Sequence, residues 1–310
     1  MPRHEPSGRT ALGLSLAAVT ISLWGSLPIA LQGALHSLDP VTLTMVRFVV
    51  AASVLALVLG WRRELPSAAD LRRAGPWLLA GAVVALTANF VGFIHGLAMT
   101  SASNAQMMIQ LAPLLLGIGG LFFFGERYAP VQWAGVAILV GGLGLFFAGN
   151  LEAPRGDRAA YVAGTGVLVV AAVTWALYGL AQKQLLHTVG SQPLMCVIYG
   201  ACGLLLVPLS DPSALAGVSA EGWGWIAYCA ANTLVGYGAF AMALEHAAAS
   251  RVSAVLALTP VMTLVFATLA AGLWPGTFPA ETLGLGQWLG GAAVVTGSLA
   301  TTLGARSARA

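Results

Sequence analysis

Long apolar segments alternate with short polar breaks along the whole chain. A helix that crosses a bilayer needs about 20 mostly apolar residues, and ten such runs lie between charges and turn residues. They are Ala11 to Leu35, Pro40 to Trp61, Pro76 to Met99, Ser101 to Phe124, Pro130 to Gly149, Tyr161 to His187, Gln192 to Leu209, Gly222 to His246, Val252 to Leu273 and Thr282 to Gly304. The short alternating segments of a membrane β-barrel are absent from the pattern. We therefore predict an all-α integral membrane protein with ten transmembrane helices.

Three of these runs need an argument of their own. The third and fourth nearly touch, and the polar residues from Thr100 to Ser103 separate them. The first run follows Arg3 and Arg9, as the core of a signal peptide would, but it is longer than such a core and contains Trp24 and Pro28. We expect it to be retained as a helix.

Composition agrees with a lipid environment. The chain is 58% hydrophobic and 8% charged, against about 25% charged in ordinary globular domains. A formal net charge of +3 without a basic stripe argues against a nucleic-acid partner. Cys196, Cys202 and Cys229 lie in apolar stretches without a C-x-x-C pair, so we predict core packing, no metal site and no cofactor.

The distribution of Lys and Arg predicts the orientation. With the amino terminus inside, eleven fall in cytoplasmic segments, two in outer loops (Arg155 and Arg158), and Arg47 lies within a helix. Positive charge concentrates on the cytoplasmic side of membrane proteins. We expect a multi-pass protein of the bacterial inner membrane with both termini cytoplasmic.

The chain also resembles itself. Leu97 to Pro113 matches Leu244 to Pro260 at five of 17 positions, Gln132-Trp133-Ala134-Gly135 recurs as Gln287-Trp288-Leu289-Gly290, and Ala88-Asn89 recurs as Ala231-Asn232. The resulting organisation is a cytoplasmic tail (1–10), a first repeat (11–149), an outer linker (150–160), a second repeat (161–304) and a cytoplasmic tail (305–310). Because each repeat holds five spans, the second is inverted relative to the first. Inverted repeats with a site at their interface recur in secondary transporters.

Short motifs point to a family. They are Trp24-Gly25-Ser26 in the first helix, Arg47 in the second, Ala102-Ser103-Asn104-Ala105 and Pro113 in the fourth, and Gly125-Glu126-Arg127 before the fifth. With these motifs in this order, the chain resembles the EamA-type branch of the drug/metabolite transporter superfamily over essentially its whole length. The second half departs from the pattern, with Gly272-Leu273-Trp274-Pro275 and a longer loop before Glu281. The resemblance implies ten helices, a central cavity and alternating access, and it favours amino acids or their derivatives as substrates.

Polar residues in mid-membrane are the candidates for binding a solute, because polar groups in hydrocarbon are costly. Asn89 and Asn232 fall near the midplane at equivalent places in the repeat; an interhelical hydrogen bond is the alternative for each. Ser103, Gln106 and Gln110 form one polar stripe on the fourth helix, which we expect to face a cavity. Aromatic and amide groups complete the substrate-binding candidates: Trp24, Gln32, Trp175, Tyr178, Gln182 and Tyr237.

Four residues are candidates for coupling or gating. His95 and Glu245 are the titratable groups we consider for proton coupling, and Lys183 lies with Glu245 near the inner surface. Arg47, about 10 Å along the second helix, either binds a substrate carboxylate or is held by carbonyls; because it belongs to the family resemblance, we favour the structural role. The chain has no G-x-x-x-x-G-K-[ST] phosphate loop, which leaves a facilitator or a proton antiporter.

The sequence therefore predicts a secondary transporter that moves a small polar or amphipathic metabolite, with an amino acid or derivative favoured and export as the direction. Uptake of an aromatic or cofactor-like compound is the second hypothesis. A channel or scramblase, or an intramembrane enzyme, is less favoured, since no G-x-S-x-G or H-E-x-x-H motif occurs. Membrane lipid is the expected surrounding, and a monomer is favoured over a dimer formed through the glycine-rich fifth and tenth helices.

Overall fold

The computed structural model describes residues 9–123, 128–152, 157–247, 252, 255–278, 280 and 283–303, and helices joined by turns and short irregular segments make up these ranges. In chain order the α-helices are Thr10–Leu35 (α1), Pro40–Arg62 (α2), Ala68–Ala74 (α3), Pro76–Met99 (α4), Ala102–Met108 (α5), Leu111–Phe123 (α6), Pro130–Glu152 (α7), Arg158–Leu185 (α8), Ser191–Leu206 (α9), Ala220–His246 (α10), Thr259–Leu273 (α12) and Leu285–Leu303 (α13). Two 3₁₀ helices, Val207–Leu209 (η1) and Pro212–Gly217 (η2), join α9 to α10.

Seven segments within the described ranges are long and apolar enough to cross a membrane. They are α1, α2, α4, the pair α5–α6, α7, α8, and α9 extended by η1. Three further helices lie outside this set of seven: α12, which is apolar but has only 15 residues, α10 with 27 residues and α13 with 19 residues. An all-helical membrane protein is therefore confirmed, whereas the count of ten crossings stays a prediction.

The fourth predicted span is broken, which corrects the expectation of one continuous helix with a polar stripe. α5 ends at Met108 and α6 begins at Leu111. Pro113 has no backbone N–H and cannot bond to the Ile109 carbonyl as a regular helix requires; that carbonyl instead accepts from the Ala112 N–H at 2.9 Å. Gln110 lies in the break, so Ser103, Gln106 and Gln110 do not share one helical rod.

The second half has a break at the matching place. Pro260 follows a turn at Ala257 and Leu258, and α12 starts at Thr259. The Thr259 hydroxyl donates to the Leu256 carbonyl at 2.6 Å, the group that proline leaves without its usual partner. Both repeats thus carry a proline-induced break in the same segment.

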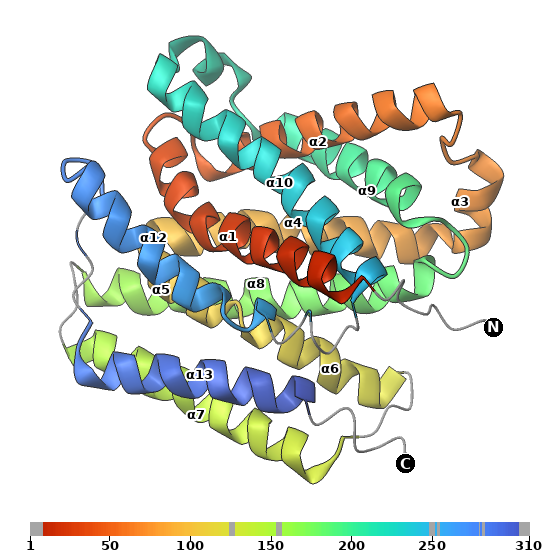
Figure 1. Ribbon diagram of the computed structural model, residues 1–310. Helices are drawn as coiled ribbons and strands as arrows, with labels where there is room; N and C mark the ends of the chain where they lie inside the picture. The colour runs from red at the N-terminus through yellow and green to blue at the C-terminus, as the bar shows by residue number, and fades with distance from the viewer. Residues whose placement is uncertain are drawn as a thin grey trace.

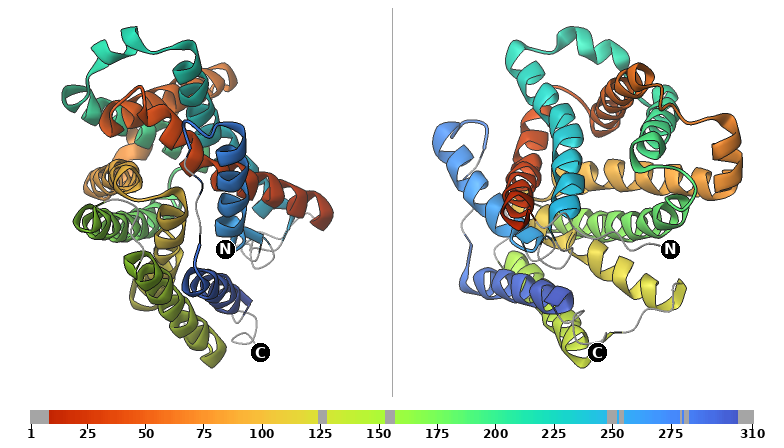
Figure 2. Two further views of the ribbon diagram at one scale, coloured as in Figure 1. Left: turned by 90° about the vertical axis from the view of Figure 1, so that its left-hand side faces the viewer. Right: turned by 45° about the vertical axis from the view of Figure 1, so that its right-hand side comes forward.

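Helices of one half pack against helices of the other (Figure 1). α4 packs along α8 and α10 along α1, while α2 packs on α9 and α7 on α13. The pair α7–α13 lies at one side of the bundle in all three ribbon views (Figures 1 and 2). α1 also packs against α12, and α8 packs against α6. If each helix is replaced by its equivalent in the other half, the same set of main helix pairs results.

Gln132 and Gln287 make equivalent contacts at the starts of α7 and α13. The Gln132 side-chain oxygen accepts from the Ala129 backbone N–H at 2.9 Å, and the Gln287 oxygen accepts from the Gly284 backbone N–H. Each bond satisfies a donor that the first turn of a helix leaves unpaired. The sequence repeat beginning at these two glutamines is therefore a repeat of local structure.

Glycines allow α7 and α13 to approach closely. A Cβ built on Gly142 would lie 2.8 Å from the Gly290 carbonyl oxygen, and one on Gly290 would lie 2.6 Å from the Phe146 backbone nitrogen. Gly135 and Gly297 form a second contact of this kind two turns away. Small residues at such crossings let backbones meet in lipid, where hydrophobic burial does not drive association.

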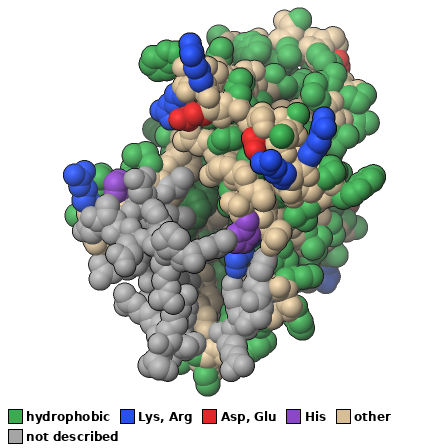
Figure 3. All heavy atoms as spheres, turned by 90° about the vertical axis from the view of Figure 1, so that its right-hand side faces the viewer, with side chains coloured by type: hydrophobic (Ala, Val, Ile, Leu, Met, Phe, Trp, Pro, Cys, Tyr) green, Lys and Arg blue, Asp and Glu red, His purple; other side chains and the backbone are tan. Residues whose placement is uncertain are grey.

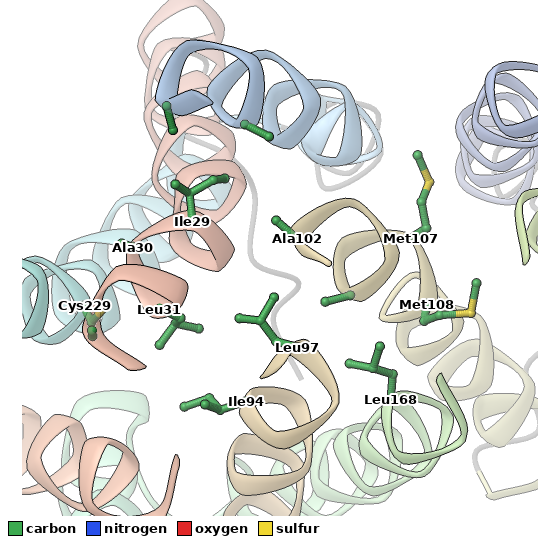
Figure 4. Packing of buried hydrophobic residues seen from close by; sticks show 14 of the residues in the cluster. Ile29, Ala30, Leu31, Ile94, Leu97, Ala102, Met107, Met108, Leu168 and Cys229 are labelled. Atoms are coloured by element: carbon green, nitrogen blue, oxygen red, sulfur yellow. The ribbon is translucent and has the colours of Figure 1, made fainter. Parts of the chain in front are cut away.

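The largest buried cluster of the described residues draws on helices of both halves, and Figure 4 shows the part of it around α1, α4, α5 and α8. Leu31 of α1 and Leu97 of α4 point toward one another, and Ala102 of α5 and Leu168 of α8 lie beside them (Figure 4). All four are at most 1% exposed. This packing ties helices of both repeats together.

One end of the bundle is rich in basic side chains. Arg62 closes α2, and Arg72 and Arg73 lie in the short helix α3, which starts with a capping box between Ser67 and Asp70. Lys and Arg side chains gather on this end (Figure 3). Trp61 and Trp77, which flank this segment, are 88% and 89% exposed, as is typical of tryptophan at a membrane–water interface.

Candidate functional site

Trp24 and Tyr237 meet at the contact between α1 and α10. Their ring centroids are 5.2 Å apart with the planes tilted by 58°, and the Phe240 ring centroid lies 5.5 Å from that of Trp24. Gly236 makes room for this arrangement, because a Cβ there would lie 2.7 Å from the Trp24 indole nitrogen. The structure thus brings together two of the predicted aromatic residues, one from each half.

Asn232 lies one turn before Gly236 on α10 and is 2% exposed. Its amide donates to the Leu23 carbonyl of α1 at 2.6 Å. Its side-chain oxygen has no hydrogen-bond partner and lies 3.5 Å from the position of a Cβ on Gly236, next to the Trp24 indole. A buried acceptor without a partner is costly, so a donor that reached this oxygen would be bound favourably.

Trp175 connects α8 to the same group of residues. Its side chain lies beside the Tyr237 hydroxyl. One and two turns along α8, Tyr178 and Gln182 both donate to the Met195 sulfur of α9, each at 3.1 Å. Trp175 therefore joins the Trp24–Tyr237 contact, whereas Tyr178 and Gln182 face α9.

Arg47 lies on α2 with 3% of its surface exposed. Its Nε and Nη2 atoms donate to the Thr233 hydroxyl of α10 at 3.3 and 3.1 Å. Its guanidinium carbon stands 4.9 Å from the ring centre of Phe90 of α4, a cation–π contact. Among the described residues a hydroxyl and an aromatic ring thus take the place of the expected carbonyls, and the choice between a structural role and a substrate carboxylate stays a prediction.

Asn89 makes the first-half counterpart of the Asn232 bond. It is 5% exposed, and its amide donates to the Ala171 carbonyl of α8 at 2.8 Å. The interhelical hydrogen bond that was the alternative for these two asparagines is thus present at both. Contact of Asn89 or Asn232 with a solute therefore stays a prediction.

The polar residues around the α5–α6 break are buried. Ser103, Gln106 and Gln110 are 2%, 7% and 8% exposed, and the Ser103 hydroxyl and the Gln110 amide nitrogen have no hydrogen-bond partner. Backbone breaks at membrane depth are found where they line a site or are enclosed by protein. These two unpartnered groups are a second place where a solute or water could be bound.

Other predicted residues lie apart from this group. His95 is exposed on α4 with Nδ1 2.9 Å from the Val91 carbonyl of its own helix, and Lys183 is exposed near the end of α8. Gln32 is partly buried about 12 Å along α1 from Trp24. The side chain of Glu245 lies outside the described residues.

Sequence reasoning missed the residues that fix these groups in place. Thr233 holds Arg47. Asn104 receives a hydrogen bond from the Tyr161 hydroxyl at 2.7 Å and donates to the Thr165 hydroxyl at 3.0 Å, which locks α5 onto α8. For the Arg47–Thr233 contact, the position of a threonine directly after Asn232 was the available signal. For the contacts of Asn104 with α8, the sequence offered no signal beyond the motif that contains Asn104.

A groove of about 210 Å³ opens between α1, α10 and α12. It is lined mainly by apolar and aromatic side chains, including Trp225 and Trp274. Its lining also includes the hydroxyls of Ser26 and Tyr228, which are hydrogen-bonded to each other with their oxygens 2.6 Å apart. Among the described residues no group of three or more His, Cys, Asp or Glu side chains is placed to hold a metal ion.

Comparison with known proteins decides the family. The model of the EamA-like transporter family matches twice, over residues 11–148 and 162–303. The chain belongs to the EamA-like transporter family. It is thus a multi-pass inner-membrane transporter with two EamA halves, in a family of transporters rather than enzymes.

Relatives extend over nearly the whole EamA chain. An uncharacterized inner membrane transporter, YhbE of Escherichia coli K12, is 34% identical over 300 residues, which is 96% of this chain and 93% of the relative. An uncharacterized transporter of Haemophilus influenzae is 33% identical over 293 residues, 94% and 95% of the two chains. A probable terminal-alkyne amino-acid exporter of Streptantibioticus cattleyicolor is 27% identical over 284 residues, 89% and 90%.

A solved structure shares the fold of this EamA protein. The crystal structure is 19% identical and superposes with a TM-score of 0.65, covering 99% of this chain and all of the other. At this identity the likeness shows the fold alone.

Proposed function

We propose that this protein is a secondary transporter that exports a small amphipathic metabolite, an amino acid or a derivative, by alternating access. Its binding site is the group formed by Trp24, Trp175, Asn232 and Tyr237. The observation that carries the proposal is the unpartnered oxygen of Asn232 beside the aromatic pair Trp24 and Tyr237, where α1 of one half meets α10 of the other.

The chemistry of this group suits an amphipathic solute. Aromatic faces cover an apolar side chain or a flat ring, and a buried amide oxygen accepts from an ammonium or hydroxyl. A contact made by residues from both halves changes when the halves rock against one another, which is what alternating access requires. The relative from Streptantibioticus cattleyicolor, named as a probable amino-acid exporter, supports amino acids as the class.

The topology in this proposal is ten spans in two inverted repeats with both termini cytoplasmic. Three observations support it: the exchange pattern of the helix pairs, the start of α1 and the end of α13 at the same end of the bundle (Figure 1), and the basic side chains gathered at that end (Figure 3). Positive charge marks the cytoplasmic side. Proton coupling stays a hypothesis that rests on His95 and Glu245, and the monomer remains the expected state.

Ligand-dependent thermal stability tests the proposal. Detergent-purified protein is heated with graded concentrations of amino acids, polyamines, vitamins and nucleosides, because a ligand that binds the folded state raises the melting temperature with concentration. We expect an amino acid or derivative to stabilise the protein, and the effect to be lost in Asn232→Ala and Tyr237→Ala. A stabilising ligand that is unaffected by both changes contradicts the site, and one from the vitamins or nucleosides favours uptake of a cofactor-like compound.

A further inference from the structure

Arg47 is a buried cation whose neighbours within the described residues are neutral. The ionisable side chains that interact with it electrostatically are Cys229, Tyr199 and Tyr237, and none of these is an anion at neutral pH. A guanidinium stays charged in proteins, and a buried charge is normally paired with an opposite one. The protein itself supplies no such partner in the part of the chain that the structure describes.

Thr233 holds the guanidinium by one edge. Its hydroxyl oxygen accepts from both Nε and Nη2 while its own proton goes to the Cys229 carbonyl at 3.0 Å. Phe90 lies against the guanidinium face. The orientation of Arg47 is therefore fixed from α10 and α4 before any solute arrives.

The other edge of the guanidinium is the Nη1–Nη2 fork. Among the described residues no acceptor is recorded for Nη1. Two parallel N–H groups at such an edge match the two oxygens of a carboxylate. A phosphate ester would bring a charge of about −1.5 to −2, more than this single cation balances.

We propose that the free edge of Arg47 binds a carboxylate of the transported solute, so that the substrate class is carboxylate-bearing metabolites. The inference rests on the proposed function and adds to it a charged anchor, Arg47, positioned by Thr233. The unpartnered oxygen of Asn232, on the residue next to Thr233, is a suitable acceptor for an ammonium group. A solute that contacted both groups would carry a carboxylate and an ammonium group.

Acid and amide pairs test the carboxylate directly. The full chain in detergent is titrated with propionate, L-leucine and L-phenylalanine and with propionamide, L-leucinamide and L-phenylalaninamide, and the melting temperature is followed to millimolar concentration. We expect at least one acid to stabilise the protein where its amide does not. In R47Q the concentration for half the effect rises roughly thirtyfold or more, as for truncation of a buried charge pair.

Two further variants keep the test decisive if R47Q does not fold. R47K retains the charge but lacks the planar fork, and T233V retains Arg47 but removes the hydroxyl that orients it. We expect both to weaken the acid and to leave its amide unchanged. Equal shifts by acid and amide, an acid effect that survives in R47Q or R47K, or no shift with any pair overturns the inference.

A result that contradicts the carboxylate site at Arg47 can be distinguished from one that contradicts the proposed transport function. Saturable transport of a neutral solute that depends on Tyr237 but not on Arg47 leaves the transporter and its site in place and removes only the carboxylate anchor. The absence of saturable transport of any solute removes both.

Discussion

Asn89 and Asn232 make the same hydrogen bond in the two halves of the molecule. Asn89 donates from α4 to the Ala171 carbonyl of α8, and Asn232 donates from α10 to the Leu23 carbonyl of α1. In each case the asparagine helix of one half is bonded to the first helix of the other. The side-chain oxygen of Asn232 is fully buried without a hydrogen-bond partner, and the oxygen of Asn89 is not among the atoms in that situation.

This difference predicts unequal costs of substitution. Asn89→Leu and Asn232→Leu each remove an interhelical hydrogen bond worth about 0.6 to 2 kcal/mol, but Asn232→Leu also removes a buried acceptor that has no partner. We expect both variants to melt below the wild type, with the smaller decrease for Asn232→Leu. Melting temperatures in one detergent without ligand measure this, and a larger decrease for Asn232→Leu would show that its oxygen is satisfied in the free protein.

Gly236 is predicted to be essential for the position of Trp24. In Gly236→Ala the new methyl group would lie 2.7 Å from the indole nitrogen, so the ring must leave its present position against Tyr237. We expect transport or ligand affinity to fall at least about tenfold, the scale of a displaced positioning group, in a protein that still folds. Gly238→Ala is the matched control on the same helix, because its methyl group meets nothing within 4 Å. Equal effects of the two changes would contradict the role assigned to Gly236.

The α7–α13 crossing gives a prediction about stability alone. Gly142→Ala places a methyl group 2.8 Å from backbone atoms of α13, and overpacking of this kind costs about 1 to 3 kcal/mol. The neighbouring Gly141 has open space, so Gly141→Ala is expected to be neutral or to stabilise by up to about 1 kcal/mol through helix propensity. Thermal unfolding of the two variants decides. A Gly142→Ala protein as stable as Gly141→Ala would show that the helices do not cross this closely.

Asp39 predicts a weak dependence of stability on pH. It caps α2 by accepting from the Val41 and Thr42 backbone N–H groups at 2.9 and 3.0 Å. Partial burial works to raise its pKa, but the hydrogen bonds from Thr42 and Val41 outweigh it, and the pKa is lowered from its usual 3.8. A lowered pKa means that this contribution is complete above the unfolded pKa and is lost as the pH falls through the folded value.

The comparison of wild type with Asp39→Asn isolates that contribution. Asparagine caps nearly as well but does not titrate. Melting temperatures from about pH 6 down to about pH 3, the range around a carboxyl pKa, should fall more for the wild type than for Asp39→Asn. Parallel curves would show that the cap does not contribute through its charge.

Much of the fold is readable from the sequence because lipid demands long apolar helices. The hydropathy pattern predicted the segments that became α1, α2, α4, α7, α8 and α10 to within a few residues, and the repeat of Gln132 and Gln287 predicted two related halves. The break after α5 was not predicted although Pro113 was noted. An apolar run looks the same whether its backbone is continuous or bent, so hydropathy carries no signal for the break.

The site is less predictable, for a geometric reason. Depth in the membrane follows from position along a helix, which is why Asn89, Asn232 and Tyr237 stood out. The direction in which each side chain points around its helix depends on packing between segments far apart in the chain. The contact between Arg47 and Thr233, 186 residues apart, therefore became visible only in the structure.

Counterflow in proteoliposomes tests the central claim of a carrier with a site between the two halves. Vesicles with purified protein are loaded with unlabelled ligand, and the entry of labelled ligand is followed in wild type and Tyr237→Ala. We predict saturable entry that is accelerated by ligand on the opposite side and lost in Tyr237→Ala. Entry that rises linearly with concentration and does not respond to ligand inside would contradict alternating access and favour a channel.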